Sequence, residues 1–412
     1  MASCPVGPAV RRKVIAVIDI ARYATHIEHD PGFRRRTAPS NLVRMARGAT
    51  PEPAVLAAAA GGDESAFARL VEPYRGELHA HCYRMLGSLH DADDAVQDTL
   101  LRAWRGLSNF QGRSALRSWL YTIATNACLT QIGRRPKRVL PIDYGPATDP
   151  HTPPGRPVIE QVWVEPYPDG TLDVEDGLAT PEARYEQREG LELAFIAALQ
   201  HLGPNQRAVL ILREVLGFSA QEAATMLQTT VASVNSALQR ARTAVRERVP
   251  ERSQQVTLRA LGDRGLRDVV DRYVDAWERC DVEAFTGLLT ADATFAMPPL
   301  ATWYTPRRTI ATWARRSSMS GQWRWRAVRT TANAQPALGF YAWDQAGGEY
   351  LPFALCVLTL RDDLVSDVTA FIVRSIEATD PDAYERFPEQ PPDERRLEAN
   401  FERFGLPDRL TD

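Results

Sequence analysis

Apolar residues recur every three or four positions between residues 63 and 138, which predicts a series of helices rather than strands. The first predicted helix buries Phe67, Leu70, Val71, Tyr74 and Leu78. The second begins near Asp91, with the apolar face Val96, Leu100, Ala103 and Trp104. The third starts at Ser114, a residue type that commonly caps helices, and buries Leu116, Trp119, Leu120, Ile123 and Ala127. We therefore expect one all-helical module over residues 63–138.

A second helical module is predicted over residues 185–250. Ser219 and Glu222 have the spacing of a capping box, which opens a short helix. After a turn at residues 228–230, a longer helix carries the buried stripe Val231, Val234, Leu238, Ala241 and Val245. Two helices joined in this way are typical of the helix-turn-helix of DNA-binding proteins.

The segment between the two modules, residues 139–184, contains nine prolines and reads as a flexible linker. A flexible chain of this length spans roughly 38 Å, so it could join modules one or more DNA turns apart, at ~34 Å per turn. Residues 163–169, with the sequence WVEPYPD, are too aromatic for a passive tether. Docking on a partner, folding back on the chain's own domains and simple packing on a neighbour all remain open for this motif.

After Pro250 the pattern changes from helices to long strands. An amphipathic helix over 266–289 is interrupted at Asp281, and strands are expected at 293–297, 323–330, 337–343, 351–360 and 364–372, with a helix at 307–315. Helices followed by a meander of strands predict an α+β cone over residues 262–376, in which a curved sheet wraps a pocket. The candidates to line this pocket, most of which fit the core better when taken as single residues, are Phe295, Met297, Trp303, Tyr304, Trp313, Trp325 and Phe340.

The two ends of the chain have weaker patterns. Residues 1–50 show no sustained period, and we expect a disordered or dispensable extension, with Met45 as a second candidate start beside Met1. Residues 377–412 are charged and rich in proline. They predict a tail that docks one helical turn through Phe401, Phe404 and Leu406.

Composition narrows the class of protein. The net charge of −3 over 412 residues excludes a uniformly basic nucleic-acid binder, so any DNA contact must rest on local patches. Five scattered cysteines without a CxxC pair indicate reduced thiols. The apolar run at 14–18 is too short for a signal peptide, and no segment has transmembrane length. We expect a cytoplasmic protein of two or three domains, with no metal, no cofactor and no membrane partner.

Charged residues in the first module mark three candidate sites. Asp94, Gln97 and Asp98 form a mostly acidic helix face that suits either a basic partner or solvent. A basic cluster near Pro136 suits either DNA phosphates or a helix C-terminus; it consists of Arg134, Arg135, Lys137 and Arg138. Between them, Phe110 precedes a short polar loop that contains Arg113. Such an aromatic residue either stacks on an unpaired base or belongs to the core.

The motifs of this module resemble region 2 of the extracytoplasmic-function sigma factors, which direct bacterial RNA polymerase to promoters. The resemblance rests on the acidic motif at 91–98, on Phe-x-Gly-x-Ser at 110–114 and on Trp-Leu-Tyr-x-Ile-Ala-x-Asn at 119–126. It implies that core polymerase is contacted by Asp94, Gln97, Asp98 and Leu101. It also implies that Phe110 and Asn126 hold a base flipped out of the promoter, and that DNA is further contacted by Arg113, Arg134, Arg135, Lys137 and Arg138.

The helix-turn-helix similarly resembles sigma region 4, which reads the upstream promoter element. On its second helix the outward-facing residues are expected to be Ala232, Ser233, Asn235, Ser236, Gln239, Arg240 and Arg242. Small polar residues in the first half suit base edges, and arginines in the second half suit phosphates. Because Asn235 and Ala237 stand where many family members have Lys and Arg, the resemblance does not carry over a promoter sequence.

Residues 270–299 resemble the start of a SnoaL-like domain, which is related to the ketosteroid-isomerase fold. The WVEPYPD motif resembles one in the sigma subgroup that carries such a C-terminal domain. We therefore predict a multidomain sigma factor, not an enzyme. Its partners are core RNA polymerase and promoter DNA, and its C-terminal domain regulates it through contacts with the helical modules or the linker. A small ligand and an anti-sigma factor remain open as further partners.

The alternative is a small-molecule-binding or isomerase-type enzyme that acts through the C-terminal pocket. All seven histidines lie at or before His201, so this domain has no imidazole base. A catalytic base would have to be Asp292 or Asp367, and an oxyanion could be stabilised only by Tyr304 or Tyr341.

Overall fold

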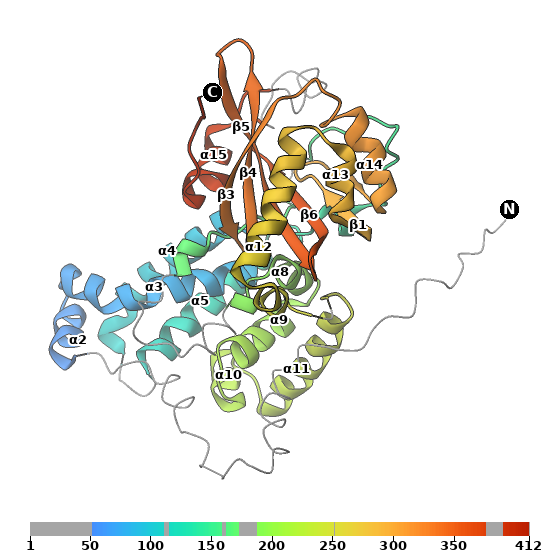
Figure 1. The fold of residues 1–412 in the computed structure, drawn as a ribbon. Coiled ribbons are helices and arrows are strands. Elements are labelled where there is room, and N and C mark those ends of the chain that lie inside the picture. Colours follow the sequence, from blue (N-terminus) through green and yellow to red (C-terminus); the bar gives the residue numbers. More distant parts are fainter. Residues whose placement is uncertain are drawn as a thin grey trace, which may run out of the picture.

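Helices occupy the first half of the chain and a mixed sheet the second half, as the computed structural model shows (Figure 1). The structure describes residues 52–110, 115–158, 162–172, 188–250, 252–375 and 390–411. The helical half lies below the sheet in Figure 1, and the C-terminal helix returns to the junction of the two tiers. Among these described residues, no helix has the length and apolar composition needed to cross a membrane.

The first module consists of α2 (Pro53–Ala60), α3 (Glu64–Leu86), α4 (Leu89–Gly106), the short η2 (Leu107–Asn109) and α5 (Leu116–Ile132). Asp63 caps α3 by accepting a hydrogen bond from the Ala66 N–H at 3.0 Å. Gly87, at φ 69°, ends α3, and Ser88 then caps α4. The N-cap of α5 is Ala115, without a side-chain bond, and the predicted cap Ser114 lies outside the described residues.

The second module contains α8 (Leu193–Gln200), α9 (Pro204–Leu210), the π-helical η4 (Ile211–Val215), α10 (Ala220–Met226) and α11 (Val231–Arg246). The predicted capping box is present: Ser219 Oγ accepts from the Glu222 N–H, and Glu222 accepts from the Ser219 N–H. Gln228 supplies the left-handed turn residue, at φ 50°, and Thr230 caps α11. The helix-turn-helix therefore forms as the sequence predicted.

The third module begins with α12 (Gln254–Glu278), kinked at Gly262, and α13 (Val282–Gly287), which Asp281 caps. Its sheet contains β1 (Leu289–Ala296), β2 (Trp303–Tyr304), β3 (Trp325–Ala332), β4 (Gln335–Asp344), β5 (Glu349–Arg361) and β6 (Leu364–Ile372). The strand order is β2-β1-β6-β5-β4-β3, antiparallel except for β1 with β6. Helix α14 (Arg307–Arg316) follows β2 and packs on β1.

Both faces of the sheet are buried, which explains the nearly continuous apolar sequence of β5. Alternate residues of a strand point to opposite faces. Cys356 and Leu358 thus face the core under α12, α13 and α14, whereas Leu355 and Val357 face the core shared with the helical modules. The outer face of this sheet is therefore the surface that joins the third module to the first two.

Aromatic side chains fill the interior of the cone, where the sequence predicted a pocket. Trp277 packs on Phe295 and Phe340, with ring centroids 6.2 and 5.2 Å apart, and Trp313 packs on Phe295 at 4.8 Å. Most of the predicted lining residues therefore form the core. Trp303 differs, since its indole N–H donates to the Gly145 carbonyl at the sheet edge.

The predicted flexible linker is instead packed on the rest of the protein at several described positions, although residues 151–153 are exposed. Residues 139–158 and 162–172 include α6 (Pro141–Tyr144) and η3 (Asp169–Leu172), and they form bridges Val139 to Trp163, Pro157 to Leu300 and Pro168 to Ala332. The ring of Tyr167 is fully buried. Proline removes backbone donors but leaves aromatic side chains free to bury, so the proline content did not exclude this packing.

The C-terminal tail forms α15 (Glu394–Asn400) and η6 (Glu402–Phe404) against the outer face of the sheet. Phe401, Phe404 and Leu406, the residues expected to dock, are buried. Gly339 allows this approach, because a Cβ there would lie 2.6 Å from Leu406 Cδ1.

Candidate nucleic-acid and protein-binding surfaces

The polar face of α4 presents the four residues predicted to contact core polymerase. Gln97 is exposed, and Leu101 is 49% exposed, an unusual position for a large apolar side chain. Asp98 pairs with Arg102 one turn later, with Arg102 Nε 3.0 Å from Asp98 Oδ1. Asp94 lies 3.9 Å from both His90 and Arg135. An exposed leucine between partly exposed carboxylates suits a protein partner that has apolar and basic residues.

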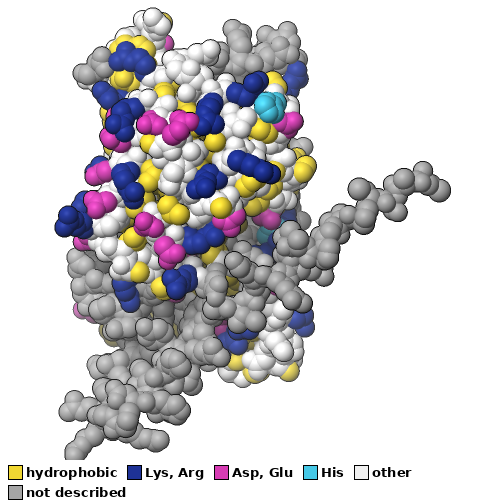
Figure 2. All heavy atoms as spheres, turned by 45° about the vertical axis from the view of Figure 1, so that its right-hand side comes forward, with side chains coloured by type: hydrophobic (Ala, Val, Ile, Leu, Met, Phe, Trp, Pro, Cys, Tyr) yellow, Lys and Arg dark blue, Asp and Glu magenta, His cyan; other side chains and the backbone are white. Residues whose placement is uncertain are grey.

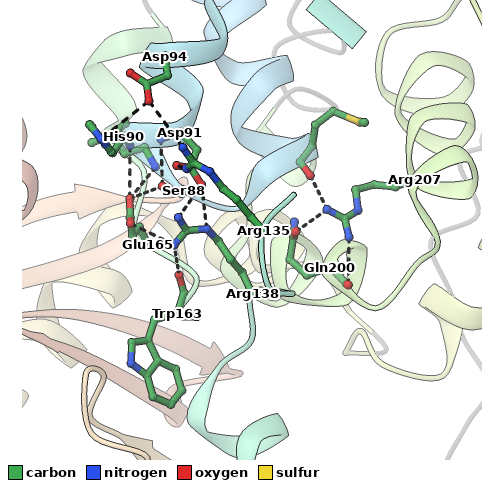
Figure 3. Close-up of polar contacts among 12 residues, drawn as sticks. Ser88, His90, Asp91, Asp94, Arg135, Arg138, Trp163, Glu165, Gln200 and Arg207 are labelled. Carbon is green, nitrogen blue, oxygen red and sulfur yellow. Dashed lines mark hydrogen bonds and ion pairs between the residues drawn. The ribbon is translucent and has the colours of Figure 1, made fainter. Parts of the chain in front are cut away.

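The basic cluster after α5 is divided between the surface and the interior. Figure 3 shows two of its members, Arg135 and Arg138, directed toward Asp91. Arg138 is only 6% exposed, and its guanidinium bonds Asp91 at 2.6 Å, Glu165 at 3.3 Å and the Trp163 carbonyl at 2.8 Å. The prediction that Arg138 contacts DNA is therefore wrong for this arrangement. Its charge is buried because it neutralises Asp91 and Glu165.

The other three basic residues lie nearer the surface. Arg135 pairs with Asp91 and Asp94, and Lys137 Nζ lies 2.8 Å from His201 Nδ1. Burial lowers the pKa of Lys137, with Asp143 acting in the opposite direction. Arg134 is exposed. The surface that can approach a phosphate backbone is thus centred on Arg134, with Arg135 and Lys137 beside it.

Phe110, which follows η2, extends a row that Trp119 and Asn126 form on α5. Phe110 is half-buried and packs on Trp119, with ring centroids 5.1 Å apart. Trp119 and Asn126 are seven residues apart and therefore share a helix face, and Asn126 is half-buried there. Arg113, predicted to contact DNA beside them, lies outside the described residues.

The outer face of α11 carries all seven residues predicted to meet promoter DNA. Every one of them is exposed: Ala232, Ser233, Asn235, Ser236, Gln239, Arg240 and Arg242. Of the predicted stripe, Val234, Leu238, Ala241 and Val245 are buried, whereas Val231, the first residue of the helix, is only half-buried. Ala237 is also buried, at 7% exposure, so this position cannot read a base edge. Arg242 Nε donates to Glu214 at 2.7 Å, which holds this guanidinium against η4.

The sequence did not predict that the two helical modules pack directly on each other. The buried Arg207 of α9 donates to the Met85 carbonyl of α3, to Gln200 Oε1 at 2.6 Å and to the Gln200 carbonyl (Figure 3). Tyr121 of α5 packs on Phe218 at a centroid distance of 5.4 Å. Burial lowers the pKa of Arg207 to about 10, so it remains charged at neutral pH. No local sequence signal distinguishes such an arginine from a surface one.

The turn between β3 and β4 penetrates the helical half of the molecule. Asn333 is fully buried; its Nδ2 donates to Tyr83 Oη and to the Leu191 carbonyl, both at 2.9 Å, and its Oδ1 accepts from the Tyr167 N–H at 2.9 Å. Gln335 Oε1 accepts from the Leu193 N–H at 2.8 Å. Asn333 adopts φ 55°, a conformation that asparagine tolerates. An asparagine between two predicted strands is typical of a turn, but the sequence does not indicate which residues this turn contacts.

The residues considered for catalysis do not converge in the cone. Asp292 is an exposed surface residue paired with Arg361, and Asp367 accepts hydrogen bonds from Thr294 and Ser366. Tyr341 donates to the Pro407 carbonyl on the opposite face of the sheet. Only Tyr304 points into the cone, where it stacks on Trp313.

The surface of the third module carries mixed charge. On the face shown in Figure 2, acidic and basic side chains alternate over the upper part of the molecule. Several form pairs across elements, such as Arg326 with Glu278 and Arg315 with Glu283. The described residues on this face do not form a single-sign patch of the kind that a nucleic-acid-binding surface requires.

Comparisons with known proteins place these features in families. The sequence matches Sigma-70 region 2 over residues 70–138, Sigma-70 region 4 over 192–245 and the SnoaL-like domain over 270–368. It is 40% identical over 348 residues to the ECF RNA polymerase sigma factor SigG of Mycobacterium tuberculosis, covering 84% of this chain and 85% of that protein.

Other similar proteins cover less of the chain or are more distant. The RNA polymerase sigma-H factor of Pseudomonas aeruginosa is 30% identical over 184 residues, which cover 45% of this chain and 86% of that protein. Among solved structures, the extracytoplasmic function sigma factor SigJ of Mycobacterium tuberculosis aligns over 76% of this chain and 96% of that chain, with 19% identity and a TM-score of 0.46.

Proposed function

Because this chain belongs to the extracytoplasmic-function sigma factors of bacterial RNA polymerase, we propose which of its surfaces carry out promoter-directed initiation. As a sigma factor it binds core RNA polymerase and directs promoter recognition, melting and the start of transcription. Its place of action is then the cytoplasm, where polymerase meets the nucleoid.

Core polymerase docks on the polar face of α4. Leu101 supplies an apolar anchor, and Gln97, Asp98 and Asp94 surround it. Anchors of this kind contribute most when they are flanked by polar groups that exclude water. Because the Asp94 carboxylate already lies near His90 and Arg135, a basic residue of polymerase would compete with these internal partners for it.

Promoter DNA contacts two surfaces. The row from Phe110 to Asn126 receives an unstacked base, with Trp119 supporting Phe110 from below. Arg134, together with Arg135 and Lys137, contacts the DNA phosphate backbone next to this base. On α11 the small polar residues meet base edges in the major groove, and Arg240 and Arg242 meet phosphates. The fully exposed row on α11, above a buried apolar stripe, is the main support for this assignment.

The packed arrangement is a closed state that must open before both DNA surfaces can work together. The two helical modules share one core, and Arg207 fixes α9 to α3. Promoter elements read by two modules lie one or more DNA turns apart, at ~34 Å per turn. The third module holds the same core through Asn333 and Gln335. We therefore assign it a regulatory role, in which it stabilises the closed state.

The third module performs no covalent chemistry in this proposal. An isomerase-type site needs a base and an oxyanion donor that converge on one substrate. Here Asp292 lies on the surface and Tyr341 faces the other side of the sheet. A ligand or an anti-sigma factor, if either acts on this chain, would do so by shifting the equilibrium between closed and open states.

Transcription in vitro tests the whole assignment. Purified chain and core polymerase should produce discrete transcripts from a library of genomic fragments, whereas core polymerase alone should not. Absence of any specific transcript, with an active polymerase control, would contradict the proposed function.

A further inference from the structure

The carboxylate of Glu165, in the WVEPYPD motif, completes the N-terminal cap of α4 from another part of the chain (Figure 3). Its Oε2 accepts hydrogen bonds from the Leu89 N–H at 2.8 Å, from the His90 N–H at 3.4 Å and from Ser88 Oγ at 2.9 Å. These two N–H groups are the first of the helix and have no partner within it. A carboxylate at this position also interacts favourably with the positive end of the helix dipole.

The N-cap residue of α4, Ser88, accepts a hydrogen bond from only one backbone N–H group of the helix, that of Asp91. This hydrogen bond to Ser88 Oγ is 3.1 Å long, and the Ser88 hydroxyl donates another to Glu165 Oε2. Glu165 is held in turn by Arg138, which also neutralises the buried Asp91. The backbone of Glu165 adds two further bonds, from its N–H to the Gly87 carbonyl at 2.9 Å and from Tyr83 Oη to its carbonyl at 2.7 Å. The first turn of α4 is thus built jointly by residues 88–91 and Glu165.

The other end of the same motif is held by the third module. The Tyr167 N–H donates to Asn333 Oδ1 at 2.9 Å, and the Asn333 N–H donates to the Tyr167 carbonyl at 2.8 Å. The Ala334 N–H donates to Asp169 Oδ1 at 2.7 Å. Only Pro166 separates Glu165 from Tyr167, so a movement of the β3–β4 turn would be passed directly to the cap of α4.

We propose that residues 163–169 are a coupling strap that transmits the position of the third module to α4, with Glu165 as its positioning residue. The proposal rests on the assignment of α4 as the polymerase-binding helix. When Asn333 holds the strap, Glu165 orders the first turn of α4 and presents the face that carries Asp94 and Asp98. When the strap is released, this turn frays, and polymerase must order it on binding.

The test compares the affinity of full-length variants for core RNA polymerase. Glu165→Ala should weaken binding about five- to tenfold, and Asn333→Ala should weaken it by a smaller factor. Because both act through the strap, Asn333→Ala should have no further effect in the Glu165→Ala chain. Additive effects of the two substitutions would overturn the proposal, since they would indicate two independent contacts.

Gln335→Ala is the matched control. Gln335 is a buried amide in the same turn, but it bonds the Leu193 N–H of the second module instead of the strap. Its effect on polymerase binding should be the same with and without Glu165. A Gln335→Ala effect that also disappears in the Glu165→Ala chain would indicate general loosening of the interface and would overturn the strap.

A second variant separates the strap from simple loss of stability. Ser88→Asp, added to Glu165→Ala, places a carboxylate at the N-cap of α4, away from the docking face, and should restore polymerase affinity. The restored chain should remain insensitive to Asn333→Ala, because its cap no longer depends on the strap. Failure to restore affinity, in a chain with the unfolding temperature of the unmodified protein, would contradict the role of Glu165. If the unmodified chain itself does not bind polymerase, the proposed function fails first, and the inference fails with it.

Discussion

Arg403 and Asp93 are 310 positions apart in the chain, yet Arg403 Nη1 lies 2.7 Å from Asp93 Oδ2. Asp93 lies on α4, and its other oxygen accepts from His79 of α3 at 3.1 Å. Partial burial raises the pKa of Asp93, but the hydrogen bonds from His79 and Arg403 outweigh it and lower the pKa overall. The last residues of the chain therefore contact the helix assigned to polymerase binding.

Arg403→Ala should lower the free energy of unfolding by no more than about 1 kcal/mol, because both side chains of the pair are partly exposed to solvent. Phe401→Ala should cost about 3 to 5 kcal/mol, since its ring is fully buried against Tyr341. Urea denaturation of both variants measures the difference. Equal losses would contradict this prediction, because they would mean that the ion pair contributes as much to the attachment of the tail as the apolar contact does.

Asp98→Arg should greatly weaken binding to core polymerase, because it reverses a charge on the proposed docking face. The control is Asp98→Arg combined with Arg102→Asp, which keeps the one-turn ion pair of α4 with its charges exchanged. If the pair matters only to the helix, the double variant should bind normally. If Asp98 meets polymerase, the double variant should remain defective. Co-purification with core polymerase distinguishes the two.

Phe110→Ala and Asn126→Ala should impair promoter opening more than closed-complex binding, since both are assigned to a base that has left the stack. The loss of one aromatic platform costs about 1 to 3 kcal/mol. Arg134→Ala serves as the comparison, because an exposed phosphate contact should weaken closed and open complexes alike. Permanganate footprinting for opening and a mobility shift for binding give the two quantities. Equal losses in both for Phe110→Ala would indicate misfolding around Trp119.

On α11, Gln239→Ala and Arg240→Ala should have different signatures although they are neighbours. Gln239 lies in the part assigned to bases, so its loss should relax the preference at one promoter position by about 1 to 3 kcal/mol. Arg240 is assigned to a phosphate, so its loss should weaken all sequences similarly and reduce the salt dependence by about one ion. Binding titrations at several salt concentrations, with a randomised upstream element, test both. If Arg240→Ala instead changed the sequence preference, Arg240 would contact a base and its assignment to a phosphate would be wrong.

Local patterns predicted the elements of this fold well, and they predicted its tertiary contacts poorly. The capping box at Ser219, the break at Asp281 and the stripe on α11 depend on residues near one another in sequence, and all three form as expected. The burial of Arg138 depends on its ion pair with Asp91, which is 47 residues away. The neighbouring residues in sequence are basic and polar, so they led to the wrong prediction of an exposed side chain. The prediction of a flexible linker also missed contacts that are distant in sequence. Tyr167 packs on Tyr83 of the first module, and its N–H bonds Asn333 of the third.

Glu192 should make the stability of the closed state depend on pH. It lies at the start of α8 and accepts the Gln255 N–H of α12 at 3.0 Å, so it joins the second and third modules. Burial raises the pKa of Glu192 to about 8, although hydrogen bonds from the backbone of Gln254 and Gln255 act in the opposite direction. The folded chain therefore keeps a proton on this carboxyl at neutral pH, whereas the unfolded chain releases it above about pH 4.3.

The sign of the effect follows from this difference. The folded-state pKa is raised, so the stabilisation is complete below the unfolded pKa and is lost as the pH rises toward 8. Between pH 6.5 and 7.5 the free energy of unfolding should fall by about 1.2 kcal/mol from this group. His81, whose pKa burial lowers to about 3, acts in the opposite direction, because it is neutral when folded and half protonated at pH 6.5 when unfolded. It offsets roughly 0.4 kcal/mol of this loss, and its contribution is the same in the unmodified chain and in Glu192→Gln. Glu192→Gln keeps an acceptor for the Gln255 N–H without a titrating proton. Urea denaturation of both chains at the two pH values should therefore show a steeper loss in the unmodified chain, and parallel losses would mean that Glu192 is charged in the folded state.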